Sequence, residues 1–469
     1  MRKIETDLTQ GDVSKRILNL TFPMLIGMMG LVIFNLVDTL FVGQLGAEQL
    51  AALSFTFPVV LGISSISSGI GLGMTALISK LVGKNDEIGV KEIATDGMIL
   101  GLLLITALVV LGLLSMDWLF SLLGANETVL EYIKLYMNIY YPGIILLVIA
   151  MLSNGIITGL GDAKTPGIVM ATAAVINVIL DPLLIFGIGP FPQMGVQGAA
   201  IATVIAQSVT ALVGIYVIVI REKTISFKNM GFKRLFISWK QVLYLGIPNA
   251  LIKIILPMAS GFLTRLFSVY GAAAVAAYGV ASRIEFFGLI FVSALASVVG
   301  PFIGQNLGAE KYDRVIEARK AGERFSLMSG IILTLTLFIF ANPIARLFND
   351  DPEVVKIIVL YLRIVPIAYG FQGILQIGST LLNVFSKPLN AATLILIQMF
   401  VLCIPLAVLG SHLWGEIGII IALAVSYIIS GFIAHFEINR NINIYADKIR
   451  ENGSEVVISK LRIKFFENL

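Results

Sequence analysis

Long apolar runs, separated by short polar or Gly/Pro-rich segments, repeat along almost the whole chain. A membrane-spanning helix requires about 20 predominantly apolar residues. Twelve segments meet that requirement, near residues 17–43, 51–79, 94–116, 132–158, 167–187, 196–220, 241–267, 273–303, 321–345, 354–382, 390–410 and 417–438. No long alternation of apolar and polar residues, the pattern of a strand, competes with them. The pattern predicts an all-α polytopic membrane protein with twelve transmembrane helices.

Composition agrees with a membrane protein. The 469 residues are 57% hydrophobic and 13% charged, with a mean hydropathy of +0.93. A soluble protein usually carries about 25% charged residues, so a large soluble helical protein is excluded. The single cysteine, Cys403, rules out an intramolecular disulfide. The first apolar run is too long for a signal peptide and lacks a cleavage site, so we expect it to remain as the first helix.

The positive charges indicate how the chain crosses the membrane. If the N-terminus and the even-numbered loops share one side with the C-terminal tail, 25 of the 33 Lys and Arg residues lie there. The opposite loops at 44–50, 187–195, 268–272 and 411–416 contain none. Because basic loops stay cytoplasmic, we expect both termini inside a cell (inner or plasma) membrane. The lipid bilayer is thus the partner that the charges indicate; neither nucleic acid nor an obligate protein partner is expected.

The second half of the chain repeats the first. Pro23 and Pro248 lie 225 residues apart, and the same offset relates Gly46 to Gly271 and Gly83 to Gly308. The offset predicts two pseudo-symmetric six-helix lobes: an N-lobe at 1–220, a cytoplasmic linker at 221–240, and a C-lobe with a basic tail at 241–469. Because six is even, the repeats are parallel. Two similar lobes with a cleft between them suit a transporter that works by alternating access.

Two carboxylates interrupt the apolar sequence of the N-lobe. A charged residue at the centre of a bilayer costs about 2.5–3.5 kcal/mol on insertion scales. Asp38 and Asp181 each lie six residues before the outer end of their predicted helix, which places both about 9 Å below that end. Asn177 precedes Asp181 by four residues and therefore shares its helix face. The sequence predicts one cation-coupling site around the two aspartates.

Other polar side chains reach a comparable depth, and the resulting set of ligands is compatible with either of two coupling ions, Na⁺ or H⁺. Thr203 and Tyr136 both lie there on their predicted helices. Carboxylate, amide and hydroxyl oxygens are suitable ligands for Na⁺, in which case Asp38, Asp181, Asn177 and Thr203 would be the metal ligands. Two apposed carboxylates in a low dielectric tend instead to retain a proton. No other cofactor is expected.

Prolines and a second group of charges complete the candidate features. Pro23 and Pro182 each remove a helix hydrogen bond, so we expect them to act as hinges; Asp181 followed by Pro182 is also an ordinary helix start. In the C-lobe, Lys253, Arg283 and Glu285 fall near mid-depth, and we expect Glu285 to pair with one of the two cations.

These features together resemble the multidrug and toxic compound extrusion (MATE) family. The resemblance rests on Pro23, VDTLFVG at 37–43, GLGDAKTP at 159–166, NVILDP at 177–182 and GVQGAAIAT at 195–203. It implies export of bulky, amphipathic and often cationic small molecules in exchange for H⁺ or Na⁺, with the ion bound by residues matching Asp38, Asp181, Asn177 and Thr203. Tyr136, Asn154 and Asn35 are candidates for the same network or for substrate contact.

One departure points to a branch of that family. NorM-type members carry acidic residues in helices 7 and 10, whereas the corresponding stretches here, 247–257 and 371–378, contain none. The chain therefore resembles the DinF-type branch, in which the first lobe alone handles the ion.

The expected function is that of a secondary active multidrug exporter and not an enzyme. The nearest alternative is a lipid-linked saccharide flippase of the same superfamily, which would require a cationic cleft for a diphosphate. A more distant alternative is a membrane-embedded transferase, but the sequence contains neither an aspartate-rich metal motif nor a His/Asp pair in a cytoplasmic loop.

Overall fold

The computed structural model describes residues 7–228 and 230–451, apart from the side chains of Ala47 and of residues 445–451, and contains only helices and connecting loops in this part of the chain. The helices are α1 Val13–Gly43, α2 Ala47–Gly83, α3 Glu87–Leu122, α4 Glu127–Gly159, α5 Lys164–Phe186, α6 Val196–Ile215, the π-helix η1 Tyr216–Arg221, α7 Phe232–Ser268, α8 Ala272–Gly308, α9 Tyr312–Phe348, α10 Pro352–Ile364, the 3₁₀ helix η2 Val365–Ala368, α11 Tyr369–Val384, α12 Pro388–Leu396, the π-helix η3 Ile397–Cys403 and α13 Ile404–Glu451.

The chain makes the twelve predicted crossings. Within the described residues, 11 continuous helical stretches are long and apolar enough to span a membrane. The last of them, Pro388–Ile444, contains a reversal at Trp414 and Gly415, where Gly415 has a φ of 63° that favours glycine. Gly410 and Gly418 then face each other so closely that neither leaves room for a side chain. This stretch is therefore two antiparallel spans, and the predicted count is confirmed.

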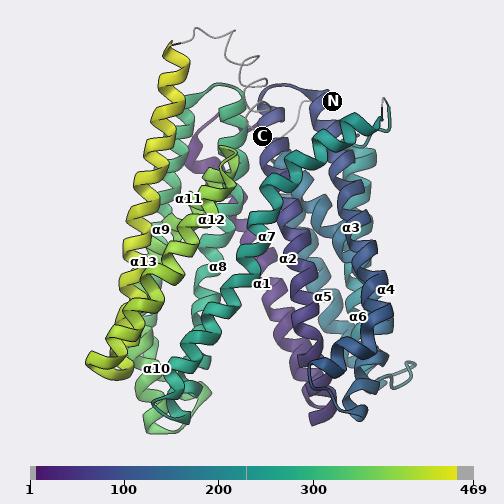
Figure 1. Ribbon diagram of the computed structural model, residues 1–469, viewed down its shortest axis with the longest axis vertical. Helices are drawn as coiled ribbons and strands as arrows, with labels where there is room; N and C mark the ends of the chain where they lie inside the picture. Colours follow the sequence, from purple (N-terminus) through teal and green to yellow (C-terminus); the bar gives the residue numbers. More distant parts are fainter. Residues whose placement is uncertain (1–6, 229, 452–469) are drawn as a thin grey trace.

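The helices form two lobes that lie side by side (Figure 1). One hydrophobic cluster runs from Val42 to Ile218 and ends with Val242, and a second runs from Leu263 to Tyr427. Each lobe thus has a core of its own, and a third cluster, which includes Ala76 of α2 and Leu295 of α8, joins the two lobes. Both described ends of the chain lie at the same end of the molecule, called here the termini end; the opposite end is called the far end.

Helix α7 begins inside the predicted linker, at Phe232, and crosses from one lobe to the other (Figure 1). Its first turns are anchored on Asp96 of α3. Arg234 donates to both oxygens of that carboxylate at 2.8 and 3.2 Å, Ser238 donates to it at 2.7 Å, and the Trp239 indole donates to the Asp96 carbonyl at 2.8 Å. The basic residues of 232–240 are therefore part of a helix that is bound to the N-lobe, which polarity alone did not predict.

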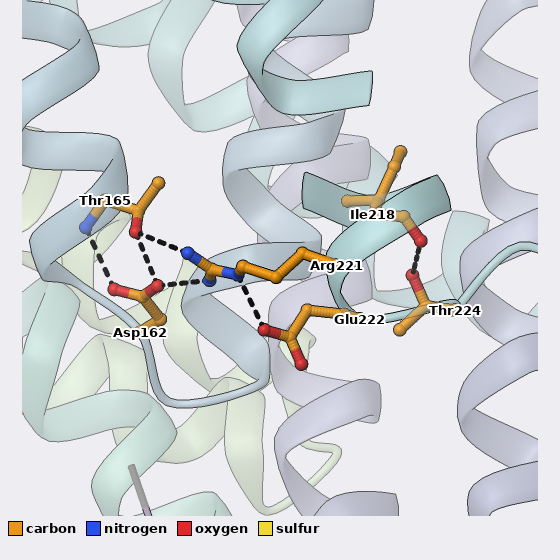
Figure 2. Close-up of polar contacts among 6 residues, drawn as sticks. All are labelled: Asp162, Thr165, Ile218, Arg221, Glu222 and Thr224. Atoms are coloured by element: carbon orange, nitrogen blue, oxygen red, sulfur yellow. Dashed lines mark hydrogen bonds and ion pairs between the residues drawn. The ribbon is translucent and has the colours of Figure 1, made fainter. Parts of the chain in front are cut away.

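A second polar cluster ties two loops of the N-lobe together at the termini end (Figure 2). Arg221, at the end of η1, donates to Asp162 at 2.6 Å and to Glu222 at 2.8 Å. Asp162 also accepts from the backbone and hydroxyl of Thr165, in the first turn of α5. Ion pairs that are partly exposed add little stability, but this one fixes the end of α6 against the start of α5, the helix that carries Asp181.

The two lobes contact each other through small residues in the half of the molecule near the termini. Gly69 of α2 packs against Gly246 and Ala250 of α7, and Gly83 of α2 lies against the backbone of Gln305. On the same helix faces toward the far end, Gly62 and Gly261 have no neighbouring atom within 4 Å of an added Cβ. Gly279 of α8 is open in the same way, and we call the open space beside these three glycines, between the far halves of the lobes, the interlobe cleft.

The start of the described chain closes the termini end further. Leu8 is buried, donates its backbone N–H to Gln305 and accepts from Asn306 of α8. Arg314 of α9 donates to the carbonyls of Leu8 and Gly11. The structure is therefore closed at the termini end and open at the far end.

The close approach of Gly69 to α7 gives a direct test of this closure. Gly69→Val should prevent the lobes from meeting, because overpacking a tight contact costs about 1–3 kcal/mol. A reporter cysteine at the buried Ser79, in a Cys403→Ala background, should then react faster with a maleimide. Gly62→Val is the matched control and should leave the labelling rate unchanged; equal rates for the two variants would contradict the assigned contact.

Candidate functional site

The predicted aspartates meet inside the N-lobe, in its far half. Asp38 comes from α1 and Asp181 from α5, and both side chains are buried. Helices α1 and α5 can approach closely because Gly27 packs directly on Gly167. The two carboxylates are near enough for their charges to interact, and no basic side chain among the described residues compensates either one.

Asn177 connects Asp181 to α6. In the amide orientation that satisfies both ends, its Nδ2 donates to Asp181 Oδ2 at 2.8 Å and its oxygen accepts the backbone N–H of Thr203 at 3.3 Å. Asn177 and Asp181 are one turn apart on α5, as the sequence predicts. Thr203 is buried beside them. The structure therefore brings Asp181, Asn177 and Thr203 into one cluster.

Aromatic hydroxyls lie around Asp38. The Tyr136 ring stacks on the Tyr140 ring at 5.2 Å, and both phenols are near enough to Asp38 to interact with its charge. Asp38 Oδ1 is buried and has no hydrogen-bond partner among the described residues. Tyr140 was not predicted, although its spacing of four residues from Tyr136 places it on the same face of α4. Within the described residues, the cluster thus provides no hydrogen-bond donor for Asp38 Oδ1.

Two other buried acids of the described chain, Asp96 and Glu323, are compensated by cations, whereas the buried Glu285 accepts only from tyrosine hydroxyls. Asp96 binds Arg234 at 2.8 Å, and Glu323 accepts from Arg319 and lies 3.1 Å from a ring nitrogen of His435. Leaving a buried charge unpaired is strongly unfavourable. Asp38 and Asp181 therefore differ from Asp96 and Glu323 in lacking a basic partner among the described residues, and from Glu285 in lying close to a second carboxylate.

The predicted ion pair of the C-lobe is wrong. Glu285 accepts hydrogen bonds from Tyr361 and, at 2.7 Å, from Tyr427, and no cation contacts it. Lys253 instead donates to Ser68 of the other lobe, and Arg283 is exposed. The reason is geometric, because Glu285 faces the interior of the C-lobe whereas Arg283, two residues earlier on α8, faces away from it.

The remaining predicted residues lie outside the cluster. Asn35, three residues before Asp38, is exposed and donates to Leu31 within α1. Asn154 lies 18 residues from Tyr136 along α4, a separation of about 27 Å, so its place in the network stays a prediction. Pro23 and Pro182 occur within unbroken helices, and their role as hinges also stays a prediction.

The architecture is that of a two-lobe membrane transporter, and comparison with known proteins gives its family. The MatE family model matches residues 23–183 and 248–409, two blocks that begin at the prolines of the internal repeat. The chain belongs to the MATE family of transporters, and it is therefore not an enzyme.

Relatives and solved structures match nearly the whole chain. A Shewanella oneidensis protein named FAD transporter is 39% identical over 92% of this chain and 95% of its own length. The multidrug export protein MepA of Staphylococcus haemolyticus is 25% identical over 91% and 93%. The crystal structure of the Vibrio cholerae MATE transporter VcmN in its bent form is 31% identical, covers 92% of this chain and 98% of VcmN, and has a TM-score of 0.86.

The amide bridge provides a structural test of the cluster. Asn177→Ala removes a donor to Asp181 and an acceptor for Thr203, and an unsatisfied buried group costs about 1–3 kcal/mol. The thermal unfolding midpoint in detergent should fall. Asn154→Ala, an amide truncation on a neighbouring helix, should leave the midpoint nearly unchanged. A larger loss from Asn154→Ala would show that the bridge has been assigned to the wrong asparagine.

Proposed function

We propose that the chain is a secondary active exporter in which one ion, bound between Asp38 and Asp181, drives the exchange between two arrangements of the lobes. The observation that carries the proposal is the pair of buried carboxylates without a basic partner. MATE transporters use ion gradients, and the chain's fold is open at the end opposite its termini. A ligand can shift such an equilibrium only if it binds the two states differently.

The structural basis for different binding is the position of the pair between α1 and α5. Helix α1 contacts the C-lobe through Met24, which packs with Ala294 and Val298 of α8. Further along α1, Asp38 faces α5 inside the N-lobe. An ion that reduces the repulsion between Asp38 and Asp181 changes how α1 packs on α5. Through α1, the same ion changes the contact between the lobes.

The proton is the coupling ion that the cluster favours over Na⁺. The Asn177 amide turns its NH₂ group, a donor, toward Asp181 Oδ2, and its oxygen is occupied by Thr203 N–H. A hard cation requires oxygen ligands, and the Thr203 N–H takes one of the two lone pairs of the amide oxygen, so the bridge leaves Na⁺ a single lone pair of the predicted amide ligand. A proton shared by Asp38 and Asp181 needs only the two carboxylates and fits the unpartnered Asp38 Oδ1.

The cargo is an amphipathic organic compound that crosses through the interlobe cleft. Cationic drugs are the first candidate, since MepA is named a multidrug export protein. FAD, a flavin with an anionic diphosphate, is the second, and it is favoured by the 39% identical relative named FAD transporter. A lipid-linked saccharide remains the rival, and it would enter the cleft from the bilayer instead of from solution.

The excess of Lys and Arg in the loops of the termini end supports a cytoplasmic location for both termini and a plasma-membrane location for the protein. With this orientation the described conformation faces outward. It would then release cargo outside and receive a proton there, which is the direction that export driven by the proton gradient requires.

The coupling proposal is tested by transport into proteoliposomes under a pH gradient and, separately, under a Na⁺ gradient. Wild type should transport a fluorescent drug or FAD under the pH gradient alone. Asp38→Asn and Asp181→Asn should each abolish gradient-driven transport, because a neutral amide cannot exchange a proton.

The matched control is Asp117→Asn, which removes an exposed carboxylate that pairs with Lys134. This variant should transport at the wild-type rate, since an exposed pair contributes little. Transport driven by the Na⁺ gradient alone would show that the coupling ion is Na⁺ and not the proton. Undiminished gradient-driven transport by both site variants would end it.

A further inference from the structure

Lys253 is a cation within the apolar span of α7, and it has no acidic partner among the residues that the structure describes. Its ammonium donates to the Ser68 hydroxyl of α2, across the boundary between the lobes. The side chain is exposed, although it lies in the middle of a helix long enough to cross the membrane. Lys253 follows Ala250, which packs on Gly69, so it stands where the contact between the lobes ends and the interlobe cleft begins.

Arg283 on α8 is a second uncompensated cation. It is exposed, and no ion pair or hydrogen bond joins it to another described residue. Ala294 and Val298 of α8 pack against Met24 of α1, and Arg283 precedes Ala294 by eleven residues, about three helical turns. Arg283 therefore lies on the face of α8 that is turned toward the N-lobe. It is nearer to the far end of the molecule than the contact with Met24.

The walls of the cleft offer these cations no carboxylate. Glu285 faces the C-lobe interior, where Tyr361 and Tyr427 donate to it, and Asp38 faces α5. On α1, the face that carries Met24 and Met28 toward the C-lobe continues to the exposed Asn35, which is uncharged. The described part of the cleft thus has a positive charge that no acidic side chain among the described residues neutralises.

Charged residues at membrane depth are costly and mark binding sites or pathways. Here the missing counter-charge has to come from what enters the cleft. Lysine provides a compact charge with three donors, and arginine a planar fork that matches phosphate oxygens. Apolar side chains are exposed on the same helices, including Phe57 of α2, Met258 of α7 and Phe287 of α8.

We propose that Lys253 and Arg283 form an anion-binding site in the interlobe cleft, which holds the phosphate groups of an amphipathic cargo while its aromatic part lies on the apolar walls. The site rests on the proposed function, because it assumes that cargo passes between the lobes. It selects phosphorylated compounds such as a flavin dinucleotide over cationic drugs.

The Lys253–Ser68 bond also supplies a step in release. In the described conformation, which is closed at the termini end, Ser68 already occupies one donor of the ammonium. Cargo phosphate and Ser68 therefore compete for Lys253 as the lobes reach this arrangement. The competition weakens the hold on cargo at the end from which it leaves.

The test is equilibrium binding to the full-length protein in nanodiscs of zwitterionic lipid, followed by flavin fluorescence. FAD should bind more tightly than FMN, and FMN more tightly than riboflavin, and added salt should weaken FAD binding. Lys253→Gln and Arg283→Gln should each weaken FAD binding by about tenfold, because each removes a charge-assisted hydrogen bond. The same variants should change riboflavin binding little. Lys253→Arg, which keeps the charge, should retain most of the affinity.

The control is Lys134→Gln, a cation of the outer N-lobe surface that pairs with Asp117, and it should bind FAD as wild type does. The inference is overturned if riboflavin and FAD bind equally, if Lys134→Gln has the same effect as Lys253→Gln, or if the Gln variants bind FAD normally. It is also overturned if phosphatidylglycerol added to the nanodiscs displaces FAD without itself being exported, since the site would then belong to a lipid headgroup.

The binding measurement separates this inference from the coupling proposal. Asp181→Asn should keep the preference for FAD over riboflavin while failing to transport FAD against a gradient. If Asp181→Asn transports normally and Lys253→Gln loses FAD binding, the coupling proposal fails and the anion-binding site stands.

Discussion

The repulsion between two buried carboxylates, which no basic side chain in the described part of the chain relieves, is the constraint on which the rest of this structure depends. Asp38 and Asp181 are held together by the close packing of Gly27 on Gly167, and by the amide bridge from Asn177 to α6. A stable protein would avoid such a pair or give each acid a fixed partner, as it does for Asp96. Keeping the pair uncompensated makes the packing of the N-lobe sensitive to a mobile ion.

In the proposed mechanism, the arrangement of the lobes turns that sensitivity into movement. Inside the N-lobe, fixed polar links such as Asp162 with Arg221 hold neighbouring loops in place. Between the lobes, the contact is made by glycines and alanines, whose small side chains let backbones pack closely but form few directional bonds. Rigid lobes joined by a smooth contact can exchange between two arrangements. The free-energy difference between these two arrangements then stays small, so the binding of one ion can determine which arrangement is populated.

Much of this architecture follows from the sequence because its signals are local or repeated. Apolar length predicts the spans, and the offset between Pro23 and Pro248 predicts the duplication. Equal depth and helical spacing predict that Asp38, Asp181 and Asn177 converge. The partners of Glu285 could not be predicted, because Tyr361 and Tyr427 reach it from 76 and 142 residues away. Arg234 contacts Asp96 across 138 residues of sequence, so this ion pair could not be predicted either. Its charge alone had placed Arg234 in the predicted linker.

Opposite charges are divided between the lobes, since the N-lobe carries uncompensated acids and the C-lobe wall of the cleft carries uncompensated cations. Proton release on cargo binding tests the link between them most directly. In weakly buffered solution, purified wild-type protein should release protons when FAD is added, and Asp181→Asn should bind FAD without release. Equal proton release by the two proteins, or none from wild type at any pH at which it transports, would contradict the account.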